Sequence, residues 1–267
     1  LFEAAPDAPF GHAVVPVTLK SADPGNTTVG RMRQDFDVVR NGNVIYLTEI
    51  HDKLPVAVVE EAPFSLEIEK PAVPLVNNGI LSLKVTAKRK EGFTKPIRVF
   101  MTWKPAGVSS LGEQTIPEGG NECHFQLDAN ANAPAGKWNF VVMGEADAGN
   151  GRIYNASPFC EVTTAPAFVS APAIPLVAVE QGQEAVMVAK IEHLQPFEGE
   201  AEASVLGVPD TIPIESAKIT KDTKEVMFKV KTHDKSPVGK QANLFVKVDV
   251  PVPGGTTTHR IALGSTL

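Results

Sequence analysis

The side chains that could do chemistry are spread thinly along this chain of 267 residues. A metal-binding histidine pair would need close spacing on one element, as in the H-E-x-x-H pattern of a metalloprotease helix. His124 alternates with two apolar neighbours and is expected to face solvent. The histidines instead stand singly and far apart, which favours structural roles for all six: His12, His51, His124, His193, His233 and His259.

Cys123 and Cys160 are the two thiols of the chain. Neither belongs to a C-x-x-C pair, and neither stands where a helix N-terminus would lower its pKa, which disfavours metal binding and nucleophilic catalysis. Two structural alternatives stay open, one disulfide between them or two buried thiols. A bridge would need their Cα atoms within about 7 Å of each other.

Serine catalysis, phosphate binding and calcium binding also lack their usual local patterns. Ser109, Ser110 and Ser157 are outside any G-x-S-x-G elbow, and no glycine-rich loop lies between a strand and a helix. Oxygen-bearing side chains alternate in Asp128–Asn132 and gather in Asp147–Asn150, which could hold calcium. Asx-rich turns are common for conformational reasons alone. We therefore expect no enzyme, no cofactor and no metal, with calcium as the weaker alternative.

Composition narrows the class of partner. A net charge of -6 argues against nucleic acid and anionic membranes as partners. Apolar residues make up 43% of the chain, yet no run approaches the roughly 18 apolar residues of a membrane span, so no membrane insertion is expected. The 22 prolines and 21 glycines are spread along the chain, as short strands with frequent turns require.

Three related segments, Asp7–Leu19, Asp128–Gly144 and Thr232–Val248, organise the chain. Each turns through Pro-x-Gly and leads into a strand of alternating apolar residues. The three copies indicate one module used three times, and the turns are structural markers rather than active-site loops. The residues that define these turns are Pro9 with Gly11, Pro134 with Gly136, and Pro237 with Gly239.

The similarity extends beyond the turns. Ile116–Lys137 aligns without a gap on Ile219–Lys240, an offset of 103 residues. A period of about 100 residues is too long for a solenoid unit and is typical of tandem β-sandwich domains. We therefore predict an all-β chain of tandem Ig-like antiparallel sandwiches, two of them complete, with modules at 1–62, 63–166 and 167–267.

Period-two alternation identifies the strands of the complete modules. In Leu81–Lys88, every second residue is apolar, as in a half-buried strand of an antiparallel sheet. Trp103 and Trp138 fall on inward rows and are expected in the core, whereas a sugar-binding platform would need aromatic rings facing solvent. The inward rows are Ile97, Val99, Met101 and Trp103; Cys123, Phe125 and Leu127; Trp138, Phe140 and Val142; Cys160 and Val162 on a closing strand in Tyr154–Thr163; and, in the third module, Val186 and Val188.

The first module is shorter than the other two. Only eight residues precede Pro9, where a full module would supply about 70. Residues 1–62 are therefore expected to be the C-terminal part of a module, with an extra hairpin turning at Asn41–Asn43 and a short strand at Val56–Val59. Such a half sandwich leaves an apolar face and an edge uncovered. Missing upstream residues, another chain or the neighbouring module must complete it.

Several phrases resemble a known class of repeat: PFSLEIEKPAVPLVNNG, EGFTKPIRVFMTWKPAGV, ITKDTKEVMFKVKT and SPVGK. They are similar to Ig-like repeat regions of large exported multidomain proteins of planctomycete-type bacteria, which often lie beside pre-peptidase-like or other secreted modules. The resemblance covers Asp7–Leu263 and rests on turns and inward apolar positions. It implies an Ig-like fold and a periplasmic, cell-surface or extracellular location, and it transfers no catalytic residue.

Three functional hypotheses follow. The first is a non-catalytic structural or interaction segment of an exported cell-envelope or extracellular protein, serving spacing, adhesion or assembly. The second is an accessory module of a secreted hydrolase, binding polysaccharide or protein through the loops at a sandwich end. The third is an assembly subunit whose incomplete first module is completed by strand addition from a protein partner.

Overall fold

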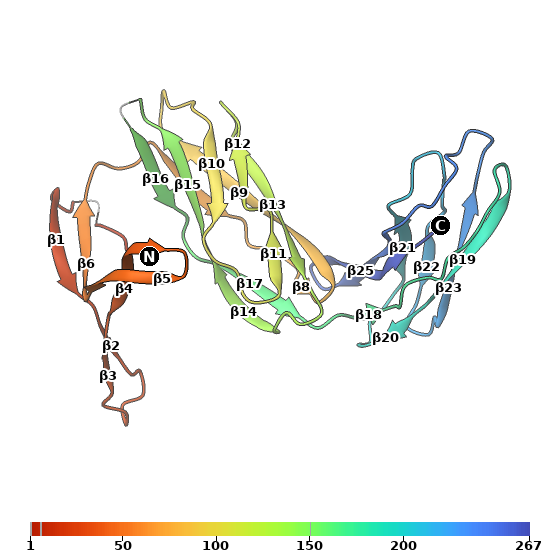
Figure 1. The fold of residues 1–267 in the computed structure, drawn as a ribbon, viewed down its shortest axis with the longest axis horizontal. Coiled ribbons are helices and arrows are strands. Elements are labelled where there is room, and N and C mark those ends of the chain that lie inside the picture. Colours follow the sequence, from red (N-terminus) through yellow and green to blue (C-terminus); the bar gives the residue numbers. More distant parts are fainter. Residues whose placement is uncertain (1, 6, 150) are drawn as a thin grey trace. The chain divides into compact units, whose positions relative to one another are not determined.

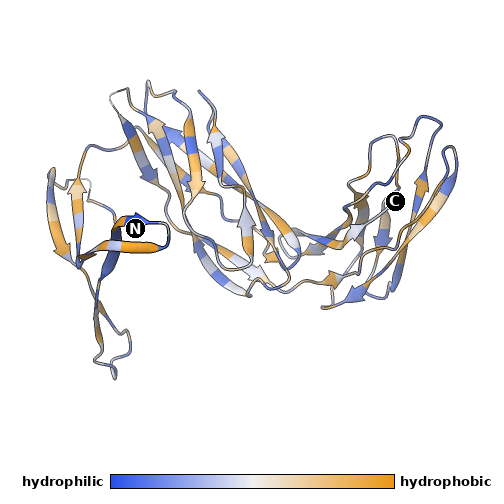
Figure 2. Cartoon of the chain, in the orientation of Figure 1, coloured by the Kyte–Doolittle hydropathy of each residue, from blue (hydrophilic) through white to orange (hydrophobic). Residues whose placement is uncertain are grey.

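The computed structural model describes residues 2–5, 7–149 and 151–267. Within these residues the regular structure consists of strands and turns without any helix, which confirms the all-β fold class. The chain divides into two compact units, Leu1–Glu61 and Ala62–Leu267, and Figure 1 shows the strands of each. Polar and apolar residues alternate along many of these strands, as Figure 2 shows.

The first unit consists of three two-stranded antiparallel sheets. The predicted hairpin is present, with a two-residue turn at Gly42–Asn43 and a left-handed φ of 59° at Gly42. No described residue of this unit is buried, and its apolar side chains lie at the surface. The pairs are β1 (Gly11–Pro16) with β6 (Lys53–Val58), β2 (Thr18–Lys20) with β3 (Val29–Arg31), and β4 (Gln34–Asn41) with β5 (Val44–His51).

The second unit begins with a sandwich whose core lies between two layers of strands. It corresponds to the second predicted module and is called the second sandwich. The inward residues of β9, among them Leu83 and Val85, are buried as the alternation predicts, and Phe125 and Cys123 lie opposite them on the neighbouring strand β13. One layer contains β7 (Phe64–Ile68), β9 (Gly79–Arg89), β13 (Glu122–Ala129) and β11 (Val108–Ser110). The other contains β12 (Glu113–Ile116), β10 (Ile97–Met101), β15 (Val142–Asp147) and β16 (Arg152–Ala156), together with β14 (Gly136–Phe140), β17 (Cys160–Ala165) and β8 (Leu75–Val76).

Two strands predicted as continuous are each divided in two. The segment after the Pro134–Gly136 turn breaks at Val141, so β14 pairs with β17 while β15 pairs with β10 and β16. The predicted closing strand breaks between β16 and β17 at Ser157 and Pro158. Ser157 exchanges hydrogen bonds with Val142 there, and Pro158 has no N–H to continue a ladder. Alternation continues across such a change of partner, so the sequence pattern does not reveal it.

The remainder of the second unit, which corresponds to the third predicted module, is a sandwich with its own core and is called the third sandwich. It repeats the plan of the second sandwich. Two short pairs form one layer, and four strands form the other. The first layer contains β18 (Val169–Ser170) with β20 (Glu192–His193), and β19 (Glu184–Lys190) with β23 (Glu225–Lys231). The second contains β22 (Ala217–Ile219), β21 (Ala201–Leu206), β24 (Leu244–Val252) and β25 (Gly255–Ser265).

The inward residues predicted for β19 are wrong by one position. Met187 and Ala189 are buried, whereas Val186 is 48% exposed. The register explains the error. Met187 pairs with Phe228 as Leu83 pairs with Phe125, but Met187 lies 104 residues after Leu83 while Phe228 lies 103 after Phe125. Because side chains alternate between faces, this single extra residue before β19 moves every side chain to the opposite face.

The two sandwiches share one eight-stranded sheet, in which β25 of the third sandwich pairs with β9 of the second. Thr258 lies opposite Ile80, and His259 lies opposite Gly79. This pairing uses the edge of β9 that also binds β7 farther along the strand. In Figure 1, β25 accordingly reaches from one sandwich to the other. The two modules therefore have separate cores but a common sheet.

Candidate functional site

The junction between the two sandwiches depends on close backbone contact. A Cβ atom on Gly79 would lie 2.6 Å from the carbonyl oxygen of Thr258, which is too close for any other residue to fit without movement. At the tip of the β24–β25 hairpin, a Cβ on Gly254 would lie 2.7 Å from the carbonyl oxygen of Ala72 in the second sandwich. Glycine is therefore required on both sides of this contact.

An ion pair crosses the junction beside the shared strands. The Arg260 guanidinium on β25 lies 2.5 Å from Oδ1 of Asp128 at the end of β13. The Arg260 main-chain N–H also donates to the carbonyl oxygen of Asn78, at 2.6 Å. Asn78 has a left-handed φ of 53°, a conformation that asparagine tolerates better than most residues. Both charged side chains are mostly shielded from solvent, so the pair is less screened than one at the surface.

His259 is completely buried at the same junction. The main-chain N–H of Phe168, in the segment that connects the sandwiches, donates to Nε2 of His259 at 3.0 Å. This contact assigns the neutral tautomer with its proton on Nδ1. Burial lowers the pKa of His259 from 6.5 to about 4, although the nearby backbone of Val248 and Thr257 and the Asp249 carboxylate oppose the shift. His259 is therefore uncharged at neutral pH.

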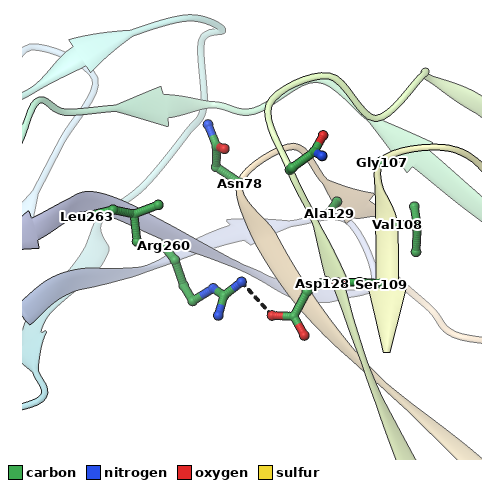
Figure 3. Close-up of a pocket in the computed structure, with 9 residues that line it drawn as sticks. Asn78, Gly107, Val108, Ser109, Asp128, Ala129, Arg260 and Leu263 are labelled. Atoms are coloured by element: carbon green, nitrogen blue, oxygen red, sulfur yellow. Dashed lines mark ion pairs between the residues drawn. The ribbon is translucent and has the colours of Figure 1, made fainter. Parts of the chain in front are cut away.

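A cavity of about 390 Å³ opens beside the ion pair (Figure 3). Four separate segments contribute polar side chains to its wall: the turn before β9, strand β11, the end of β13, and β25. Figure 3 shows the Arg260–Asp128 pair at one side of the cavity. The polar lining residues are Asn78, Ser109, Asp128, Asn130 and Arg260.

Both cysteines are buried and unpaired, so of the two alternatives the structure contains the thiols. Cys123 is on β13 opposite Val85, and Cys160 is on β17 opposite Phe140. Burial raises the pKa of Cys123 to about 11. Burial also raises the pKa of Cys160, with a smaller opposing effect from Lys70. Both side chains are protonated at neutral pH and are poor nucleophiles.

The other candidates for chemistry stay dispersed. Among the described residues, no three His, Cys, Asp or Glu side chains are placed to hold a metal ion. Asn130 Oδ1 accepts a hydrogen bond from the main-chain N–H of Asn132, and Asp147 Oδ1 accepts one from Gly149. These bonds are Asx turns, which account for the oxygen-rich segments by conformation. Asn150, at the end of the second segment, lies outside the described residues.

Trp103 is not a core residue. Strand β10 ends at Met101, and Trp103 follows it with 50% of its surface exposed. Its ring centre lies 6.1 Å from that of Trp138, which is half-buried and donates its indole N–H to Oγ1 of Thr164. The nearby Pro105 could have indicated that the strand ends before Trp103, because proline cannot donate to a β-ladder. The fold thus places one exposed indole beside an anchored one.

None of the Pro-x-Gly turn residues lines the cavity at the junction. Gly136 and Gly239 have positive φ values of 157° and 123°, and Gly11 is the first residue of β1. The residues that the fold does gather were missed from the sequence, because Gly79, His259 and Arg260 belong to different modules. No local pattern marks a glycine that must admit a strand from far along the chain.

No helix in the described part of the chain is long and apolar enough to cross a membrane. No family model matches the chain, and no curated protein matches it. Three solved structures are similar to the chain. A protein of unknown function from Porphyromonas gingivalis W83 has 9% identity and a TM-score of 0.30, over 75% of this chain and 98% of that one. The titin domains Z1Z2 in complex with telethonin have 12% identity and a TM-score of 0.22, over 75% of this chain and 96% of that one, and the fibronectin(III)-like modules of Clostridium thermocellum CbhA have 12% identity and a TM-score of 0.25, over 73% and 91%. The strand pairing of this chain shows its fold directly.

Proposed function

We propose that the chain is a non-catalytic structural and interaction segment of an exported cell-envelope or extracellular protein, in which Ala62–Leu267 acts as a stiff spacer. The pairing of β25 with β9 carries this proposal. Rotation of one sandwich against the other would break that pairing and the Arg260–Asp128 contact together. The export of the parent protein is supported by the resemblance of the repeat phrases.

The segment that connects the two sandwiches, residues 166–169, supports the same conclusion because it is held in place. Ala167 and Val169 are buried, unlike residues of a flexible linker. The side-chain amide of Gln195 donates to the carbonyl oxygens of Pro166 and Ala167, at 2.8 and 3.1 Å. The connection is therefore held by hydrogen bonds as well as by packing.

The experiment is a distance measurement by electron spin resonance between labels at Thr115→Cys and Asp222→Cys, exposed positions in the second and third sandwiches. We expect one narrow distance distribution for the parent chain and a broad one after Gly79→Val. Gly112→Val is the matched control, because a Cβ there meets no atom within 4 Å. A broad distribution in the parent chain would refute the spacer.

A second role, assembly through the first unit, is supported by strand pairing. β1 pairs with β6 from Gly11 to Pro16 as β14 pairs with β17 from Gly136 to Phe140. In the second sandwich β17 also pairs with β8, and β15 also pairs with β10. Within the described residues of the first unit, β6 and β2 each have one partner only. Such open edges favour the addition of a strand from a protein partner.

Hydrogen exchange on the full chain tests this role. The probe is a synthetic peptide spanning residues 95–104, which contains β10, the strand that pairs with β15 in the second sandwich. In the first unit β2 follows β1 as β15 follows β14, so β2 is the strand that the peptide should pair with. We therefore expect the peptide to slow hydrogen exchange at the main-chain amides of β2. The control peptide has Val99 and Met101 replaced by aspartate. Equal protection by both peptides, or by neither, would contradict strand addition.

A binding role, as an accessory module of a secreted hydrolase, is supported by the exposed indole of Trp103 beside Trp138. Exposed aromatic rings supply large apolar contact area at a binding surface. Retention on insoluble polysaccharide, compared between the parent chain and Trp103→Ala, tests this role. Tyr154→Ala removes another exposed ring and should change nothing. Unchanged retention of Trp103→Ala would reject this site.

A further inference from the structure

We propose that the cavity at the junction of the two sandwiches binds a neutral polyhydroxylated ligand, such as a sugar residue of a glycan. Its volume of about 390 Å³ is within the range of small-molecule sites, roughly 300–1,000 Å³. The cavity also lies between two domains, where such sites frequently occur. This site is separate from Trp103 and adds a ligand to the proposed spacer.

Several polar groups in the wall have no partner among the described residues. Nε of Arg260 is buried without a hydrogen bond. Asn130 uses its side-chain oxygen for the Asn132 main chain, which leaves its two amide hydrogens as donors. The Asn78 side chain is partly buried and the Ser109 hydroxyl is exposed, and neither makes a hydrogen bond within the described chain. Polar side chains that line one cavity and can exchange their water for a ligand favour a ligand rich in donors and acceptors.

The charges of the wall select against charged ligands. Arg260 would attract a carboxylate or a phosphate, but the Asp128 carboxylate lies against it and would repel the same anion. A cation meets the opposite conflict. A neutral hydroxyl can accept from the partly exposed Arg260 guanidinium and donate to the partly exposed Asp128 carboxylate without disturbing the pair. Hydroxyl groups are both donors and acceptors, so they match this mixed wall.

The location predicts a further property. Arg260 and Leu263 belong to the third sandwich, whereas Asn78, Ser109 and Asn130 belong to the second. A bound ligand would therefore contact both sandwiches. Because it binds only when they are joined, it should raise the melting temperature of the full chain.

The test uses saturation-transfer NMR and thermal melting of the full chain with methyl α-glucopyranoside, N-acetylglucosamine and lactose. Acetate and tetramethylammonium are the charged probes. The test variant combines Asn78→Gly, which keeps the left-handed backbone, with Ser109→Ala. Ser65→Ala, an exposed serine on β7 outside the cavity wall, is the control.

We expect saturable binding of at least one neutral sugar, a higher melting temperature, and about tenfold weaker binding in the double variant. The control should bind as the parent chain does. Three results would each overturn the proposal: silence of all neutral probes, equal binding by the double variant, or charged probes that bind in their place. Spin-label distances report on the spacer independently, so the two ideas can fail separately.

Discussion

Lowering the pH should loosen the junction through His259. Its side chain is completely buried, and its pKa is about 4 in the folded chain against 6.5 as the ordinary value. Between these values the unfolded chain binds a proton that the folded chain does not. A difference of about 2.5 pKa units corresponds to about 3 kcal/mol at about 1.4 kcal/mol per unit. This contribution is complete above pH 6.5 and is lost as the pH falls through 4.

Urea unfolding at a series of pH values from 7.5 to 4 measures this loss. Carboxylates such as Glu161, whose pKa is lowered by Lys137, also titrate near the acid end, so a variant must isolate the histidine. His259→Gln keeps an acceptor for the Phe168 N–H but does not titrate. We expect the parent chain to lose about 3 kcal/mol more than this variant over the range. His124→Gln, at an exposed position, is the control and should follow the parent chain.

Two results would refute this reasoning. Equal pH dependence in the parent chain and in His259→Gln would show that the buried imidazole is not the titrating group. An NMR titration in which His259 keeps a pKa near 6.5 in the folded chain would show that the ring is hydrated. In either case the junction would not exclude water as the burial of His259 indicates.

Three further perturbations test the packing. Gly79→Val should lower the unfolding free energy by about 1–3 kcal/mol in urea melts, because its Cβ would lie 2.6 Å from the Thr258 carbonyl oxygen; an unchanged midpoint would contradict the close contact. Phe125→Ala and Phe228→Ala should each lower the unfolding free energy by about 3–5 kcal/mol, because both side chains are fully buried. Since the two sandwiches share a sheet, each substitution should shift the same single calorimetric transition, and two independent transitions would show that the modules unfold separately. Iodoacetamide at pH 8 should leave Cys123 unmodified until urea is added, because burial raises its pKa to about 11; mass spectrometry of the native chain would show any premature reaction.

Much of the fold could be predicted from local pattern. Alternation with a period of two identified β9 and β13 and the residues that they bury, because that period reflects the geometry of a single strand. The hairpin at Gly42 was equally predictable, since a two-residue turn with positive φ favours glycine. These features depend on neighbouring residues alone.

Errors began where a local pattern had more than one structural solution. The apolar run at Val186–Ala189 fits either face of a strand, and its register depends on one extra residue before β19. Trp103 continued an alternating row, but the ladder had already ended at Met101. Alternation specifies which residues share a face, and the partner strand decides which face is covered and where pairing stops.

The candidate site at the junction could not be predicted from the sequence, because it depends on which strands of the two modules pair. Local patterns were enough to predict an all-β chain with a repeated module, most of its core rows and most of its turns. The pairing of β25 with β9, the contact of Arg260 with Asp128 and the uncharged burial of His259 followed from tertiary packing alone. Strand pairing between modules depends on hydrogen bonds between backbone N–H and C=O groups, and every residue carries both except proline, which lacks the N–H. Such pairing therefore leaves only a glycine, a charge pair and a histidine as its trace in the sequence.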